Sequence, residues 1–126
     1  MDKQNAFILW FDQLSIDDTP LVGGKNSSLG EMYRELVHKG VNIPNGFAVT
    51  AHAYHHFVEK AGIKDKIREI LQDLDTGDTR QLEKKGEEVR HVIMHAEFPQ
   101  EVKDAITESY RNLEKQYGEK VDVAVR

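Results

Sequence analysis

The most informative stretch of this chain reads Val22-Gly23-Gly24-Lys25-Asn26-Ser27-Ser28-Leu29-Gly30-Glu31-Met32. Paired glycines permit backbone conformations that other residues avoid, so Leu21–Ser27 is predicted to be a loop. Ser28 and Glu31 have the spacing of a capping box, which predicts that a helix begins at Ser28 and ends at Gly40. The apolar side chains expected on its buried face are Leu29, Met32, Tyr33, Leu36 and Val37.

A glycine loop that leads into a helix favours the binding of anions. The first amides of a helix have no acceptor within it, and the helix dipole places partial positive charge there. Lys25 adds a full charge, so Gly23, Gly24 and Lys25 are predicted to bind a phosphate group. The stretch is not a Walker A loop, because Thr19 stands where that motif needs glycine. The alternative is that the loop only redirects the chain and that Lys25 is a solvated charge.

Strands are predicted on both sides of this stretch. Ala6–Phe11 is a continuous apolar run, Phe47–Val49 follows a turn, and Val121–Val125 begins with alternating apolar and polar residues. Asp17–Pro20 is expected to break the chain after the first strand. The predicted fold class is therefore helix-rich α/β, with a small sheet built from the segments around Phe7, Phe47 and Val123.

Four amphipathic helices are predicted between the second and third strands. Thr50 can cap the first, which ends at Gly62, and Ile63–Leu74 contains the second, closed by the turn Asp75–Asp78. Two longer helices follow, and Pro99 opens the later of them. The larger side chains expected to be buried in this helical layer include Tyr54, Phe57, Val58, Leu82, Tyr110 and Tyr117.

Composition excludes several classes of protein. At 126 residues, with 39% hydrophobic and 31% charged residues, the chain is long enough for one folded domain and too apolar for a disordered one. A net charge of −5 argues against a nucleic-acid surface, so phosphate binding has to be local. The absence of cysteine excludes disulfides and thiolate sites. No apolar run suits a signal peptide or a membrane span, and a cytoplasmic location is expected.

The histidines do not predict a metal site. His52 and His56 are four residues apart, as are His91 and His95, and such pairs can share a metal ion. Neither pair has a third ligand in a recognised spacing, so exposed helix histidines are the simpler interpretation. No serine has a recognisable base beside it, and no catalytic residue is predicted in this chain.

Three motifs, in this order and spacing, resemble the N-terminal nucleotide-binding region of the phosphoenolpyruvate synthase family. They are Val22–Met32, the stretch Ile43–Thr50 that reads Ile-Pro-Asn-Gly-Phe-Ala-Val-Thr, and Val123-Ala124-Val125-Arg126. The aromatic start Leu9-Trp10-Phe11 is similar too. Pyruvate phosphate dikinases and rifampin phosphotransferases are similar in this region, but the glycine-lysine stretch looks more like the synthases.

The resemblance implies an ATP-grasp type nucleotide-binding domain within a large, multidomain phosphotransferase. Such an enzyme converts pyruvate, ATP and water to phosphoenolpyruvate, AMP and phosphate, using Mg²⁺ and a phosphocarrier histidine in another domain. By this resemblance, Lys25 and Arg126 contact the ATP phosphates, and Gly23 and Gly24 supply loop backbone. Pyruvate would bind in a part of the enzyme outside this chain.

The last predicted strand runs into Arg126 without a turn or a cap, and the family motif continues beyond this point. We therefore expect residues 1–126 to be a truncated N-terminal domain whose partners are the remaining domains and which does not turn over alone. One alternative is a sister enzyme with another acceptor, such as rifampin or a glucan. Another, from a different class, is a helical interaction or regulatory module in which Lys25 is incidental.

Overall fold

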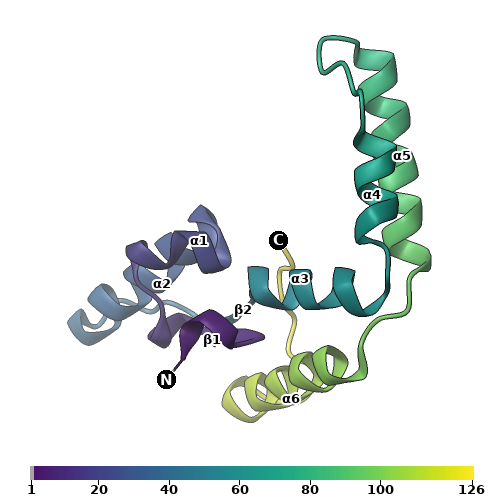
Figure 1. Cartoon of the computed structure of the whole chain (residues 1–126). Helices are drawn as coiled ribbons and strands as arrows, with labels where there is room; N and C mark the ends of the chain where they lie inside the picture. Colours follow the sequence, from purple (N-terminus) through teal and green to yellow (C-terminus); the bar gives the residue numbers. More distant parts are fainter. Residues whose placement is uncertain (1) are drawn as a thin grey trace. The chain divides into compact units, whose positions relative to one another are not determined.

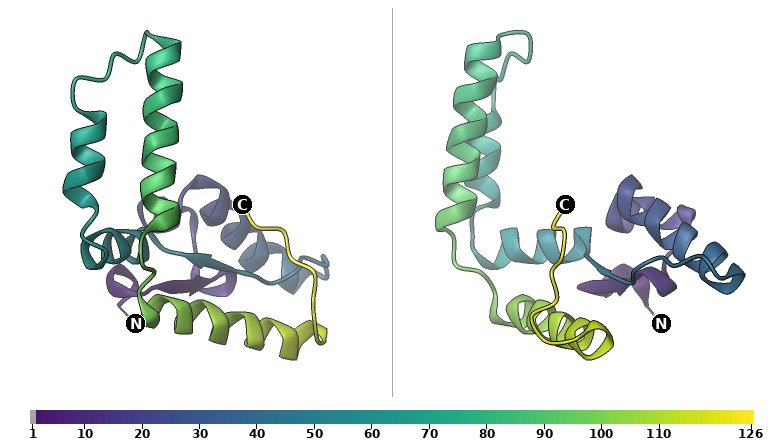
Figure 2. Two further views of the ribbon diagram at one scale, coloured as in Figure 1. Left: turned by 90° about the vertical axis from the view of Figure 1, so that its right-hand side faces the viewer. Right: turned by 180° about the vertical axis from the view of Figure 1, so that it is seen from behind.

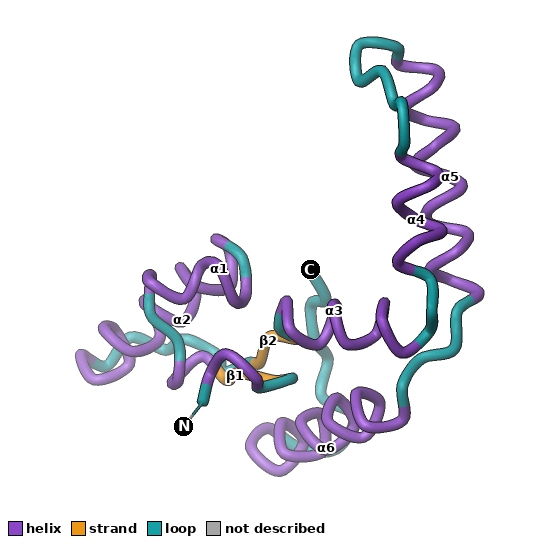
Figure 3. Tube along the Cα trace, viewed as in Figure 1, coloured by secondary structure: helices purple, strands orange, loops and turns teal. Residues whose placement is uncertain are grey.

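The computed structural model describes residues 2–126, which form two compact units: residues 2–54 with Gln100–Arg126, and His55–Pro99. Helices make up most of both units, and the described residues form two short strands (Figures 1 and 3). The elements of the first unit are β1 (Ile8–Trp10), α1 (Thr19–Val22), α2 (Gly24–Leu36), β2 (Phe47–Val49), the start of α3 (Ala51–Lys60) and α6 (Gln100–Tyr117). The helix-rich α/β class is confirmed.

The sheet consists of β1 and β2, which pair antiparallel with Leu9 opposite Ala48. The first strand is shorter than the apolar run Ala6–Phe11 predicted. Its chain turns into a 3₁₀ helix at Phe11–Gln13, because the Gln13 side chain accepts a hydrogen bond from the Trp10 backbone N–H at 2.8 Å. Within the run Leu9 is buried and the other residues are half-buried, so the apolar pattern overestimated both the burial and the length of the strand.

The predicted third strand was wrong. Val121–Arg126 is irregular, and the side chain of Val125 is 92% exposed. The Tyr110 hydroxyl donates a hydrogen bond to the Val121 carbonyl at 2.9 Å, and within residues 2–126 no strand edge pairs with the amides that follow. Alternation alone does not make a strand, because a strand needs a hydrogen-bonding neighbour.

The core of the first unit is formed by residues of β1, β2 and α1 and by Leu14, which follows the first 3₁₀ turn after β1. Leu9, Leu14, Val22 and Ala48 are buried together. Thr50 joins the sheet to α3: its backbone N–H donates to the Phe7 carbonyl, and its hydroxyl accepts from the Ala53 N–H at 3.2 Å. The predicted Thr50 cap is confirmed.

The chain is helical where Asp17–Pro20 and Leu21–Ser27 were expected to be a break and a loop. A 3₁₀ helix at Ile16–Asp18 leads into α1, and Gly23 alone separates α1 from α2. The capping box was also wrong, because α2 begins at Gly24 and Ser28 lies inside it. Glu31 instead accepts a hydrogen bond from the Ile16 backbone N–H at 3.0 Å.

The buried face of α2 also differs from the predicted apolar stripe. Its buried residues are Ser27 and Gly30, whereas the side chain of Met32 is 46% exposed. The 3₁₀ segment at Phe11–Gln13 and the adjoining Leu14 approach α2 so closely that small side chains are needed on the helix. The face of α2 that packs inward is therefore the one with small residues, because the neighbouring backbone lies close to it, and not the one with the most apolar side chains.

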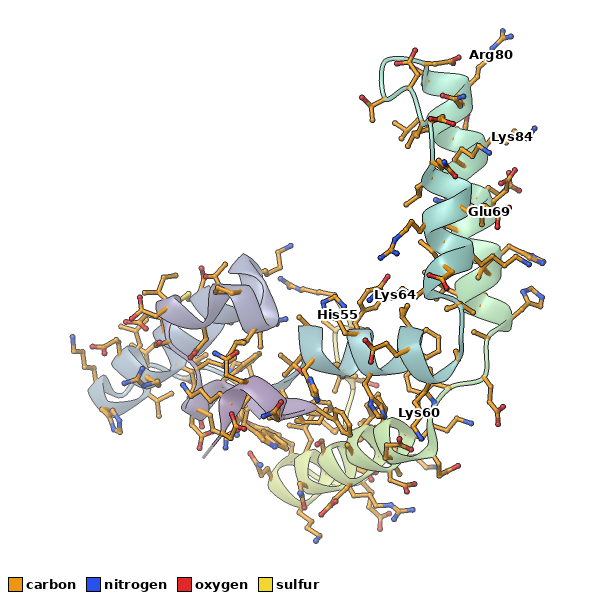
Figure 4. The ribbon with its side chains drawn as sticks, viewed as in Figure 1. His55, Lys60, Lys64, Glu69, Arg80 and Lys84 are labelled. Atoms are coloured by element: carbon orange, nitrogen blue, oxygen red, sulfur yellow. The ribbon has the colours of Figure 1, made fainter. Side chains whose placement is uncertain are left out.

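The second unit contains a helical hairpin. In it, α4 (Lys64–Leu71) and α5 (Thr79–His95) lie side by side (Figure 2). The Asp78 carboxylate caps α5 by accepting from the N–H groups of Arg80 and Gln81, which confirms the predicted turn. Arg80 and Lys84 point away from the hairpin into solvent (Figure 4). Neither helix contains a fully buried residue.

Helix ends were predicted better than buried side chains. The helices end before Gly40, Gly62 and Gly118 as expected, each of which has a positive φ. Phe57 and Val58 are buried, as predicted, but Tyr54, Leu82 and Tyr117 are each about half exposed. The Tyr117 hydroxyl accepts a hydrogen bond from the Asn45 backbone N–H at 2.7 Å. This tyrosine is therefore a surface contact and does not belong to the core.

Candidate functional site

The glycine turn between α1 and α2 is the first part of the candidate site. Gly23 has φ 83° and ψ 162°, a conformation that is essentially restricted to glycine. Its N–H donates to the Thr19 carbonyl at 2.8 Å, and its carbonyl accepts from the Ser27 N–H at 3.0 Å. Apart from the adjoining residues and the backbone of the helix itself, no heavy atom of the described residues lies within 4 Å of the position that a Cβ would take at Gly23 or Gly24. Backbone hydrogen bonds therefore fix the inner side of the turn, and no other segment of the described residues covers its outer side.

Free hydrogen-bond donors gather at this turn. The backbone N–H groups of Gly24, Lys25 and Asn26 form the first turn of α2 and precede its first intrahelical donor, Ser27. Lys25 is exposed, and within the described residues its ammonium group has no hydrogen bond or ion pair. Three free amides at the positive end of a helix, beside an unpaired ammonium group, form a site suited to an anion.

Polar side chains hold the turn from behind. The Asn26 amide donates to the Val22 carbonyl at 3.0 Å, and the hydroxyls of Thr19 and Ser27 are 2.8 Å apart. Ser27 is fully buried, whereas Lys25 on the same turn is exposed. Ser28, the predicted cap, takes no part in these contacts, and the sequence pattern did not indicate Thr19 or Ser27. The only available signal was their spacing of four residues on either side of Gly23.

Asp18 is the acidic group closest in sequence to the turn, and it is neutralised locally. The Lys3 ammonium, 2.9 Å from its carboxylate, lowers the pKa of Asp18 below the ordinary value, although burial acts in the opposite direction. The backbone N–H of Ser15 donates to the same carboxylate at 2.9 Å and lowers the pKa further. The carboxylate therefore stays ionised while its charge is balanced.

The lowered pKa of Asp18 predicts a loss of stability in acid. The folded protein holds the proton of the Asp18 carboxyl less tightly than the unfolded chain does. The stability that Asp18 contributes is therefore complete above its ordinary pKa of about 4, and it falls as the pH decreases below that value. We expect Asp18→Asn to lower the free energy of unfolding by about 1.5 kcal/mol at neutral pH. This loss is at the low end for charge-assisted hydrogen bonds because the Lys3 side chain is 36% exposed. Urea denaturation at pH 7 and pH 3 measures this cost, which should shrink in acid.

Asp17→Asn is the matched control for Asp18→Asn. Asp17 is the neighbouring aspartate and is exposed. We expect its substitution to change the free energy of unfolding by less than about 0.5 kcal/mol at either pH. Equal losses for the two variants would show that the Lys3 contact does not stabilise the fold.

Arg126, the second predicted phosphate ligand, is not joined to Lys25 in this structure. It ends the irregular segment Val121–Arg126 and has no hydrogen bond or ion pair with the rest of residues 2–126. Gly23, Gly24 and Lys25 thus share one turn, and no hydrogen bond or ion pair within residues 2–126 links Arg126 to it. The role predicted for Arg126 stays a prediction.

A hollow in the same unit differs from the glycine turn in chemical character. It measures about 370 Å³ and is lined by β1, the turn after it, and α6. Its one charged lining side chain is Glu108, and Phe7 and Trp10 supply aromatic surface. A carboxylate repels phosphate, so this hollow is not a second anion site.

The histidine pairs form no metal centre in the described part of the chain. The rings of His91 and His95 lie with their centroids 4.0 Å apart, and His52 stacks on Phe7. Residues 2–126 contain no group of three or more His, Asp or Glu side chains that could hold a metal ion. None of the helices described here is long and apolar enough to cross a membrane.

Comparison with known proteins identifies the family. The model of the pyruvate phosphate dikinase AMP/ATP-binding domain matches residues 19–126. The chain is 47% identical over 98% of its length to a phosphoenolpyruvate synthase of Synechocystis, and 46% identical over its full length to that of Aquifex aeolicus. The synthase of Escherichia coli is 42% identical over 86% of the chain. The chain spans 14% to 16% of the lengths of these relatives. It belongs to the family of pyruvate phosphate dikinase AMP/ATP-binding domains.

Proposed function

We propose that this chain is the N-terminal ATP-binding part of a phosphoenolpyruvate synthase and that the glycine turn binds the ATP phosphates. The relatives named above carry that activity in their names. The proposed enzyme transfers phosphoryl groups from ATP to pyruvate and water, releasing phosphoenolpyruvate, AMP and phosphate. The phosphocarrier histidine and the pyruvate site lie in other domains. The location is cytoplasmic, because both substrates are metabolites of the cell interior.

The observation that carries this proposal is the unpaired Lys25 ammonium beside three free amides. Phosphoryl transfer depends mainly on positioning and on balancing negative charge, and these donors serve both purposes. Gly23 and Gly24 leave the outer side of the turn open, so phosphate oxygens can approach the backbone. Arg126 supplies a second cation to the ATP phosphates in the proposal.

Magnesium and the ATP-grasp fold belong to the proposal as well. Mg²⁺ usually binds proteins through one or two carboxylates together with substrate phosphates. Residues 2–126 hold no cluster of metal ligands, so Mg²⁺ would be bound by the phosphates and by carboxylates from elsewhere in the enzyme. The two-stranded sheet and its helices would form one part of a larger ATP-grasp domain.

Lys25→Ala in the full-length enzyme tests the site. Removing a charge-assisted phosphate contact costs about 1.5 to 3 kcal/mol, so we expect ATP affinity to fall about ten- to a hundred-fold. The KM for ATP should rise while the KM for pyruvate stays unchanged. Lys39→Ala is the control, because Lys39 is an exposed lysine beyond the far end of α2. Unchanged ATP affinity in Lys25→Ala would remove this turn from the nucleotide site.

A further inference from the structure

A closed set of hydrogen bonds links α2 to the segment that precedes the glycine turn. The Glu31 carboxylate accepts from the Ile16 N–H at 3.0 Å, and the Ile16 carbonyl accepts from the Thr19 hydroxyl at 2.8 Å. The Thr19 hydroxyl is in turn 2.8 Å from the Ser27 hydroxyl. Because Ser27 and Glu31 are one helical turn apart, the path returns to the face of α2 where it began. We call these four residues the polar ring.

The two hydroxyls of the polar ring have one proton each, and either oxygen can be the donor of the bond between them. The Thr19 hydroxyl has one proton, and the Ile16 carbonyl can only accept it. When the Thr19 proton goes to the Ile16 carbonyl, the Ser27 hydroxyl is the donor to Thr19 Oγ1. Ser27 Oγ has a second possible acceptor in the Gly24 carbonyl, 3.0 Å away. The hydroxyl of Ser27 therefore keeps a partner when Thr19 is changed, and we expect the fold to tolerate that change.

The polar ring encloses the glycine turn. Gly23 lies midway between Thr19 and Ser27 and is bonded through its backbone to both. Two backbone bonds and one hydroxyl bridge thus connect the same three residues, so Gly23 cannot rotate without breaking one of them. The free amides and Lys25 follow directly on the outer side of this turn.

We propose that the polar ring positions the first turn of α2, so that its free amides and Lys25 face the ATP phosphates together. This inference rests on the proposed function, since it assigns supporting residues to the same site. Thr19, Ser27 and Glu31 are positioning residues and do not themselves contact the nucleotide. Preorganised donors bind a developing charge without the cost of rearrangement, which is the benefit such a ring provides.

Thr19→Val in the full-length enzyme is the main test, because valine keeps the shape of threonine and loses the hydroxyl. A neutral hydrogen bond contributes about 0.5 to 1.5 kcal/mol, so we expect the KM for ATP to rise about two- to twelve-fold. Thr19→Ser restores the hydroxyl and should restore the KM. A merely structural role would lower the amount of active enzyme, and hence the apparent kcat, with no change in the KM for ATP.

A double-mutant cycle with Ser27→Ala tests the bridge itself. Both single variants remove the same bond, so Thr19→Val with Ser27→Ala should raise the KM for ATP no further than the larger single effect. Amide exchange provides a readout that needs no nucleotide. In Thr19→Val, the amides of Gly23 and Ser27 should exchange faster than in the unchanged protein. Additive effects on KM, or unchanged exchange, would overturn the proposal.

The Lys25→Ala variant separates the two proposals. If it raises the KM for ATP and Thr19→Val does not, the nucleotide site stands and the positioning role is wrong. If neither variant changes the KM for ATP, both the proposed nucleotide site and the proposed positioning role are wrong. If both raise it and Thr19→Ser restores it, both proposals are supported.

Discussion

Gly30→Ala should destabilise the first unit by about 3 kcal/mol, measured as a loss in the free energy of unfolding by urea denaturation. A Cβ at Gly30 would overlap the Cβ of Leu14 and would lie 3.2 Å from the Phe11 carbonyl oxygen. Both are backbone or near-backbone atoms, so no side-chain rotation relieves the overlap. The helix would have to move away from the 3₁₀ segment that it packs against.

Gly86→Ala provides the matched control, because it makes the same substitution inside another helix. A Cβ at Gly86 would lie 3.2 Å from the end of the Arg90 side chain, which can rotate away. Alanine is favoured over glycine in helices by about 1 kcal/mol, so this variant should be as stable as the unchanged protein or more so. Similar losses at both positions would show that the close packing of Gly30 on Leu14 is not what limits stability.

Gly23→Ala should cost about 1 to 3 kcal/mol of stability and should weaken ATP binding as well. At φ 83° and ψ 162° an alanine is strained even though the space around it is empty. The strain can be relieved only by rotating the turn, which moves Lys25 and the free amides. Urea denaturation and the KM for ATP in the full-length enzyme measure the two effects.

Gly24→Ala separates those two effects. Gly24 is the first residue of α2 and has ordinary helical geometry, so alanine should change stability by less than about 0.5 kcal/mol. In the proposed site, its methyl group would occupy the open space through which a phosphate reaches the backbone. We therefore expect a raised KM for ATP with normal stability. A normal KM would mean that the phosphate does not approach Gly24.

Local patterns in the sequence predicted the helix ends correctly, since these depend on residues close together in the chain; the predicted anion site has the same local basis and stays a prediction. Glycine is favoured wherever φ is positive, and Gly40 and Gly62 end their helices for that reason. Lys25 is adjacent to the glycines in sequence, so no fold is needed to bring them together. The same locality made Thr50 recognisable as a cap.

Contacts between distant residues were predicted less well. The apolar pattern predicted that Met32 is buried, whereas Met32 is exposed and Gly30 packs against Leu14. The spacing of apolar residues does not show where another segment of backbone approaches a helix. Tyr117 was predicted to lie in the core, but its hydroxyl accepts a hydrogen bond from the backbone N–H of Asn45, which is 72 residues away along the chain. The Val121–Val125 strand failed for the same reason, because its pairing depends on a neighbour that the pattern cannot specify.

The sequence by itself determined that a cationic glycine turn opens a helix, because φ preferences, amide positions and the charge of Lys25 are properties of neighbouring residues. Only the tertiary structure decided what holds this turn in place. The bonds of Glu31 to Ile16 and of Lys3 to Asp18 each join residues 15 positions apart. Such bonds form only after the chain has folded back on itself, and the loop-closure entropy that opposes them is offset by the packing of the whole unit.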